Sequence, residues 1–163
     1  MLINIKNKDK LIINDFKFKC CIGKKGTKKH KIEGDYSTPK GIFSVGMLYY
    51  REDRVAKPIT TLKTKIIKSN MCWCDDPKSK FYNKEIKIPN KIQYEKLYRK
   101  SHKYDLLILI NYNIKKILPY KGSAIFIHLT KNYSPTAGCI ALRKKDFLIL
   151  LKLIDKKTKI KIY

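Results

Sequence analysis

Apolar and polar side chains alternate along residues 2–21, which is the period expected of short β-strands. The polar stretch at residues 7–10 interrupts this pattern, and residues 11–14 resume it. A polar break between two alternating segments is typical of a hairpin, and residues 16–22 continue the pattern beyond it. The N-terminal segment therefore predicts a hairpin followed by a third strand.

Two later runs have the length of strands and are mostly apolar. Residues 104–112 and 124–129 are of this kind, and we expect both to be central strands of the core. Shorter strand candidates lie elsewhere in the chain, at residues 42–50, 62–67 and 159–163. Strands should therefore supply most of the regular structure.

Two segments have helical character. Residues 89–99 begin with a proline and carry Ile92, Leu97 and Tyr98 on one side, which predicts a short amphipathic helix. Residues 145–154 are dense in Leu and Ile, as a buried helix would be. We therefore expect a mainly β, β-rich α+β fold with one or two short helices, and a length of 163 residues suits one domain spanning the chain.

Two polar stretches separate the predicted elements. Residues 23–41 contain several turn-forming groups and predict a long ordered loop, of the kind that often carries function. Residues 71–77 form a compact group ending in a proline, which breaks the neighbouring strands. Within the long loop, Asp35 and Thr38 are expected to hold the backbone in place.

The chain is strongly basic, with a formal net charge of +25 and 38 Lys and Arg residues. Only four of these are arginines, and the lysines are spread along the whole length instead of forming one patch. Specific nucleic-acid recognition relies heavily on clustered basic residues and on arginine, so this composition does not predict it. The positive field should still favour approach to acidic surfaces such as anionic cell-wall polymers.

The termini and the cysteines set further limits. No run of 18 apolar residues is present, and the first residues lack the apolar region of an export signal, so the sequence predicts neither a transmembrane segment nor a signal peptide. Five cysteines cannot all pair, so at least one thiol must be free. Of these, Cys20 and Cys21 are adjacent in a predicted strand and are expected to serve packing.

Candidate chemistry lies near the end of the second apolar run. His128 ends this strand, and Gly138 and Cys139 follow after a polar loop. A thiol nucleophile needs a base and donors for an oxyanion, which His128 and the amides of Gly138 and Cys139 would provide. A charged His128 nearby would lower the pKa of the Cys139 thiol. The alternative is that Cys139 is a small buried hydrophobe and His128 a strand-end histidine without a catalytic role.

Several blocks of the chain together resemble the catalytic domain of the L,D-transpeptidase (YkuD-type) family. Thr136-Ala137-Gly138-Cys139 is similar to its Ser/Thr-x-Gly-Cys core, and residues 34–43 are similar to its Gly-Asp-x-x-Thr-Pro-x-Gly-x-Phe element. Residues 73–83 and 122–128 resemble blocks of one subgroup.

The resemblance implies a β-sandwich enzyme that acts on peptidoglycan stem peptides without a cofactor. Cys139 would attack the carbonyl after a diaminopimelate or similar centre, and the acyl group would pass to an amine. His128 would transfer the proton, the Leu129 carbonyl would orient its ring, and the amides around Gly138 would form the oxyanion hole. The resemblance also implies a place in the cell envelope, and we expect a monomer.

Substrate contacts are predicted at Trp73, Tyr133, Thr136 and Arg143. The sequence departs from the family pattern at Ala137 and Ala141, where members commonly carry His and then Arg or Asn, so Arg143 is expected to take over a substrate contact. The loop from His128 to Cys139 is also shorter than in well-known members.

Other interpretations stay open. Cys72 and Cys74 lie near acidic residues and His102, but their spacing is poor for a structural zinc site, so we expect no metal. Water could replace the amine acceptor, which would make the protein an L,D-carboxypeptidase. The third interpretation is a Lys-rich module that binds cell-wall polymers or other polyanions and has no activity.

Overall fold

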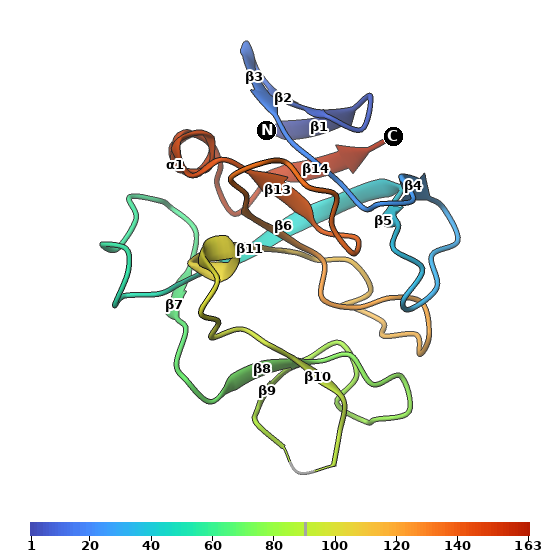
Figure 1. Ribbon diagram of the computed structural model, residues 1–163. Helices are drawn as coiled ribbons and strands as arrows, with labels where there is room; N and C mark the ends of the chain where they lie inside the picture. The colour runs from blue at the N-terminus through green and yellow to red at the C-terminus, as the bar shows by residue number, and fades with distance from the viewer. Residues whose placement is uncertain (90) are drawn as a thin grey trace.

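A nine-stranded sheet forms most of the protein in the computed structural model, which describes residues 1–89 and 91–163 (Figure 1). Its order is β13-β12-β11-β6-β14-β1-β2-β3, and β7 pairs with β6 off this path. The strands are β1 (Leu2–Lys6), β2 (Lys10–Ile13), β3 (Phe16–Lys19), β6 (Gly41–Tyr50), β7 (Thr64–Ile66), β11 (Leu106–Ile110), β12 (Phe126–Leu129), β13 (Ile140–Leu142) and β14 (Lys159–Ile162). The predicted hairpin, third strand and central strands are confirmed.

Strand β6 joins the two halves of this sheet. Its first residues, Gly41 to Ser44, pair with β14, and the segment from Val45 to Tyr50 pairs with β11. The β6–β11 register shifts between Ile108 and Ile110, as at a bulge. Bulges and bends let a strand pass from one layer to another, so the sheet curls into a barrel-like sandwich. The expected β-rich sandwich class is confirmed.

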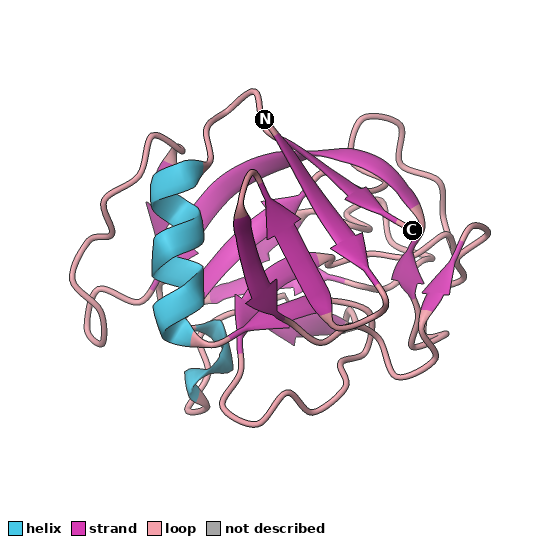
Figure 2. Ribbon diagram, turned by 90° about the horizontal axis from the view of Figure 1, so that it is seen from above, coloured by secondary structure: helices cyan, strands magenta, loops and turns pink. Residues whose placement is uncertain are grey.

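One α-helix covers an opening of this sandwich. Helix α1 (Lys144–Leu153) follows β13 and buries Phe147, Leu150 and Leu151 in the main apolar cluster (Figure 2). The helix predicted at residues 145–154 is therefore confirmed. Within the described residues, no helix has the length and apolarity needed to cross a membrane.

A second, smaller sheet lies at the opposite end from β1–β3 (Figure 1). It consists of β8 (Met71–Cys74), β9 (Glu85–Lys87) and β10 (Tyr94–Lys96), in the order β10-β8-β9. Residues 71–77 were expected to be a compact interruption, but β8 is a fully buried strand. Its side chains join β11 and β12 in a second apolar cluster that includes Trp73, Phe126 and Cys139.

The amphipathic helix predicted at residues 89–99 is wrong. Tyr94–Lys96 is instead strand β10, which pairs antiparallel with β8, and residue 90 lies outside the described residues. Of the three apolar residues that suggested a helical face, only Leu97 is buried, while Tyr98 is exposed. Pairing with the free edge of β8 thus outweighed a weak local preference.

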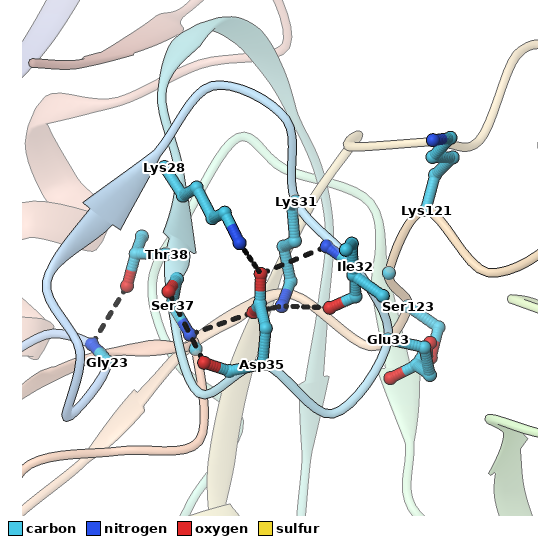
Figure 3. Close-up of polar contacts among 12 residues, drawn as sticks. Gly23, Lys28, Lys31, Ile32, Glu33, Asp35, Ser37, Thr38, Lys121 and Ser123 are labelled. Carbon is cyan, nitrogen blue, oxygen red and sulfur yellow. Dashed lines mark hydrogen bonds and ion pairs between the residues drawn. The ribbon is translucent and has the colours of Figure 1, made fainter.

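Contacts between its two arms hold the long loop at residues 23–41 in place. Two short strands, β4 (Thr27–Lys28) and β5 (Thr38–Pro39), pair in parallel within it. The Gly23 N–H also donates to Thr38 Oγ1 at 2.8 Å (Figure 3). This contact confirms that Thr38 holds the loop. A short 3-10 helix, η1 (His102–Tyr104), precedes β11 and contacts β12.

Candidate active site

A cavity of about 670 Å³ lies where β12, the segment before β13, the long loop and the small sheet meet. His128, Gly138 and Cys139 all contribute to its lining, and so does Thr136. The predicted nucleophile, base and turn residues are thus brought to one cavity.

The pairing of β12 with β13 positions the thiol and the imidazole. The two strands are parallel, with Ile127 opposite Ile140. Cys139, one residue before β13, therefore lies beside Phe126, whose N–H donates to Cys139 Sγ at 3.4 Å. His128 follows Phe126 by two residues, and side chains at that spacing share one face of a strand. The strand register itself directs Cys139 and His128 to the same side of the sheet.

Hydrogen bonding fixes the state of the His128 ring. Its Nδ1 lies 2.9 Å from the Leu129 carbonyl oxygen, which can only accept, so Nδ1 carries the proton and the Nε2 lone pair is free. This contact agrees with the role that the resemblance implied for Leu129. Burial lowers the pKa of His128 to about 4, and Lys103 and Arg99 add to the effect. At neutral pH the ring is an uncharged base.

Cys139 is also held in its neutral form. The residue is 8% exposed, and its thiol donates to the Ala124 carbonyl at 3.2 Å. Burial raises the pKa of Cys139 to about 12, with Glu95 acting in the same direction. The expected lowering of this pKa is therefore wrong. A buried His128 carries no charge at neutral pH, so the resting pair is a thiol and an imidazole, not an ion pair.

The turn before Cys139 is tightly bonded. The Thr136 hydroxyl donates to the Cys139 carbonyl at 2.6 Å and accepts from the Gly138 N–H at 3.1 Å. Gly138 has a φ of +144°, and a Cβ there would lie 2.8 Å from the Ser37 carbonyl oxygen. Only glycine fits this conformation and this close approach. The Gly138 amide, which we expected to be free, is engaged in the resting structure.

The other predicted substrate contacts lie outside the cavity lining. Trp73 is buried in the second apolar cluster, and its Nε1 donates to Asn83 Oδ1 at 2.9 Å. Arg143 lies over the Tyr133 ring, 5.2 Å from its centroid, next to the start of α1. Trp73 is thus a core residue, and the Tyr133 ring is contacted by Arg143 and, at 4.9 Å, by Lys19.

Sequence reasoning missed the charged wall of the cavity. Glu33 Oε2 accepts from the Tyr82 hydroxyl and from Ser123 Oγ, the latter at 2.7 Å. Figure 3 shows Glu33 beside Ser123. Lys31 and Asp35 form an ion pair at 2.7 Å in the same loop. The available signal was the position of Lys31 and Glu33 just before the block at residues 34–43, which resembles the family.

The second half of that wall comes from the small sheet. Glu95 accepts from Arg99 Nη2 at 2.6 Å and from the Tyr104 hydroxyl, and burial raises the pKa of Glu95. The Tyr104 ring in turn lies 5.4 Å from the His128 ring. Glu95 and Arg99 lie in the segment predicted as a helix, and that wrong prediction concealed their contact with Tyr104.

The remaining cysteines are separate from this chemistry. All five are free thiols, and Cys72 and Cys74 are buried within β8. Among the described residues, no three His, Cys, Asp or Glu side chains gather in an arrangement that could hold a metal ion. Cys20 and Cys21 are likewise buried just beyond β3, as expected of packing residues.

Together, the barrel-like sandwich and the cysteine and histidine lining its cavity define a β-rich domain with one candidate active site. The family model for the L,D-transpeptidase catalytic domain, YkuD, matches residues 2–162. The chain belongs to this family.

Comparison with solved structures agrees on the fold. The chain resembles the crystal structure of Pgp2, a helical cell shape determining protein from Campylobacter jejuni, with a TM-score of 0.50 and 19% identity over 99% of this chain and 46% of that chain. A point variant of Pgp2 gives a TM-score of 0.49 and 18% identity, over 99% of this chain and 45% of that chain. The chain thus spans about half the length of the solved structures it matches. No curated protein matches it.

Proposed function

We propose that this protein is a peptidoglycan L,D-transpeptidase that works through an acyl-enzyme on Cys139. The observation that carries the proposal is the pairing of Cys139 with His128 in one cavity, on one face of neighbouring strands, with the His128 Nε2 lone pair free. Family membership supports peptidoglycan as the substrate.

The reaction starts from the neutral pair. His128 Nε2 takes the thiol proton while a sulfur electron pair forms the bond to the stem-peptide carbonyl carbon. The resulting tetrahedral intermediate collapses, the C–N bond breaks, and the leaving amine takes the proton from His128. An incoming amine then attacks the thioester, and Cys139 recovers its proton through the same imidazole. Charge separation is confined to the transition states and the tetrahedral intermediates.

The charges around the cavity support a zwitterionic peptide as the ligand. Basic side chains line part of it and acidic side chains another part: Lys31, Arg99 and Lys103 on one hand, and Glu33, Asp75 and Glu95 on the other. A stem peptide with a diaminopimelate centre carries both carboxylates and an amine, so it can pair with both sets. The envelope is the proposed place of action, and a role in cell shape, as the name of Pgp2 states for that protein, is proposed here too.

The test is incubation with a purified disaccharide tetrapeptide, followed by mass analysis of the products. Cross-linked dimers would support transpeptidation, and release of the tripeptide form alone would replace it with carboxypeptidation. Cys139→Ala should abolish either product. Cys21→Ala, which removes a buried thiol bonded to the Ser134 carbonyl at 3.2 Å and outside the cavity lining, should keep it. A folded wild-type protein that releases neither product would favour the non-catalytic binding module.

A further inference from the structure

Lys31 is a buried lysine in the wall of the active-site cavity. Its side chain is only 3% exposed, yet it contributes to the same lining as Cys139. Lysine is rarely buried to this extent because its ammonium loses hydration, so a buried lysine calls for a partner or a role. Figure 3 shows Lys31 and Lys28 reaching toward the carboxylate of Asp35.

The contacts of Lys31 leave part of its bonding capacity unused. An ammonium has three N–H donors. One is directed to Asp35 Oδ1 at 2.7 Å, and a second makes a long contact of 3.5 Å with the Ile32 carbonyl. Asp35 does not rely on Lys31 alone, because its two oxygens also accept from the Ile32 and Ser37 amides at 2.9 and 3.0 Å. The ammonium therefore retains a donor for a further partner.

Two glycines make room for Lys31 beside the nucleophile. A Cβ on Gly122 would lie 2.8 Å from Lys31 Cε, and a Cβ on Gly138 would lie 3.6 Å from Lys31 Nζ. The aliphatic part of the Lys31 side chain thus packs on Gly122, and its ammonium lies beside Gly138, which precedes Cys139. A positive charge is thus held beside Gly138, the residue that precedes the proposed nucleophile.

The backbone alone supplies an incomplete oxyanion site. The Gly138 N–H already donates to Thr136 Oγ1, which leaves the Cys139 N–H as the amide of this turn available to an oxyanion. Oxyanion sites in acyl transfer commonly use two donors aimed at the developing charge. The charge of Lys31 also acts on the thiol, where it opposes the larger effect of burial on the pKa of Cys139.

We propose that the Lys31 ammonium is a catalytic residue that donates the second hydrogen bond to the oxyanion. As sulfur bonds to the carbonyl carbon and the thiol proton moves to His128, the carbonyl π electrons move onto oxygen. That oxygen accepts from Lys31 Nζ and from the Cys139 N–H. When the C–N bond breaks, the electrons return to the carbonyl and Lys31 is released unchanged. This inference rests on the acyl transfer proposed above.

The decisive comparison is between two lysines that contact one carboxylate. Lys28 lies 3.9 Å from Asp35 Oδ2 and its side chain is 47% exposed, so it is a matched control outside the cavity lining. Lys31→Met should lower kcat for the disaccharide tetrapeptide about 100-fold or more, as loss of one oxyanion donor does, with KM changed little. Lys28→Met should leave both constants within about twofold. An unchanged kcat in Lys31→Met, or a loss confined to KM, would overturn the proposal.

A second experiment tests the effect of the Lys31 charge on Cys139 without substrate turnover. Alkylation of Cys139 by anionic iodoacetate should slow relative to neutral iodoacetamide in Lys31→Met but not in Lys28→Met. A ratio equal to that of the wild type would show that the ammonium does not act at the thiol. If Lys31→Met does not fold, the double variant Lys31→Met/Asp35→Asn removes both charges and leaves no unpaired carboxylate. A folded double variant with wild-type kcat would likewise overturn the proposal.

The outcomes separate this inference from the proposed function. An inactive wild type, indistinguishable from Cys139→Ala, would reject the acyl transfer on which both depend. An active wild type with an equally active Lys31→Met would reject only the role of Lys31.

Discussion

The two walls of the cavity hold their ionisable groups in opposite states, although burial opposes charge on both. On the strand wall, burial keeps His128 and Cys139 neutral, with pKa values of about 4 and about 12. On the loop wall, burial opposes ionisation of Asp35 as well, yet the Ile32 and Ser37 amides and Lys31 hold its pKa below the usual value. The difference lies in the contacts, because two amides and an ammonium donate to the Asp35 carboxylate, whereas the Cys139 thiol accepts one long bond of 3.4 Å from the Phe126 N–H.

This contrast determines where charge can exist during the reaction. The loop holds permanent charges beside the cavity, and in the proposed acyl transfer Cys139 and His128 stay uncharged until substrate binds. An oxyanion formed between the two walls would meet a fixed field without reorganisation of the protein, which is the arrangement that favours acyl transfer.

The largest effect is expected from removing the base on the strand wall. His128→Gln keeps a polar side chain but has no group that can accept the thiol proton, so kcat for the disaccharide tetrapeptide should fall about 1000-fold. Steady-state product analysis by mass spectrometry measures this. His30→Gln alters an exposed histidine of the long loop and should leave kcat within about twofold. Activity of His128→Gln close to that of the wild type would contradict the role of the imidazole.

The same histidine should make stability depend on pH. Its pKa is about 4 in the folded protein, against 6.5 for an unperturbed histidine. Below pH 6.5 His128 is protonated in the unfolded chain but stays neutral in the folded chain. The folded state therefore loses stability as the pH falls toward 4. The loss due to His128 should be about 3 kcal/mol between pH 7 and pH 4. Urea unfolding of the wild type and His128→Gln at several pH values isolates this part, and equal slopes would contradict a buried neutral ring.

The sequence revealed the strand wall better than the loop wall. Alternation and apolar runs predicted most strands, and the block ending in Cys139 carried the family resemblance. The state of Cys139 was mistaken because only the fold shows how deeply it is buried. Glu33 and Tyr82 meet across a separation of 49 residues, which no local pattern indicates. The helix expected at residues 89–99 failed for a related reason, since the partner strand β8 had been interpreted as an interruption.

The loop wall should lose stability when its central carboxylate is neutralised. Asp35→Asn leaves the buried ammonium of Lys31 without a counter-charge and weakens the acceptors of two amides. The expected loss is about 2 kcal/mol, below that of a fully buried pair because Asp35 is partly exposed. The wild-type contribution of Asp35 should also fade as the pH drops through its lowered pKa. Chemical unfolding measures both, and Asp15→Asn, at an exposed turn, should change stability by less than about 0.5 kcal/mol.

The smallest effect concerns a backbone position of the same loop. Gly34 has a φ of +74°, and a Cβ there would meet no atom within 4 Å. Gly34→Ala should therefore lower the free energy of unfolding only by the strain of the left-handed conformation, about 1 kcal/mol, and should preserve kcat. The same change at Gly138 would add a contact of 2.8 Å with the Ser37 carbonyl, so it does not isolate that strain. A loss of several kcal/mol in Gly34→Ala would mean that the loop is bound more tightly around Asp35 than its contacts indicate.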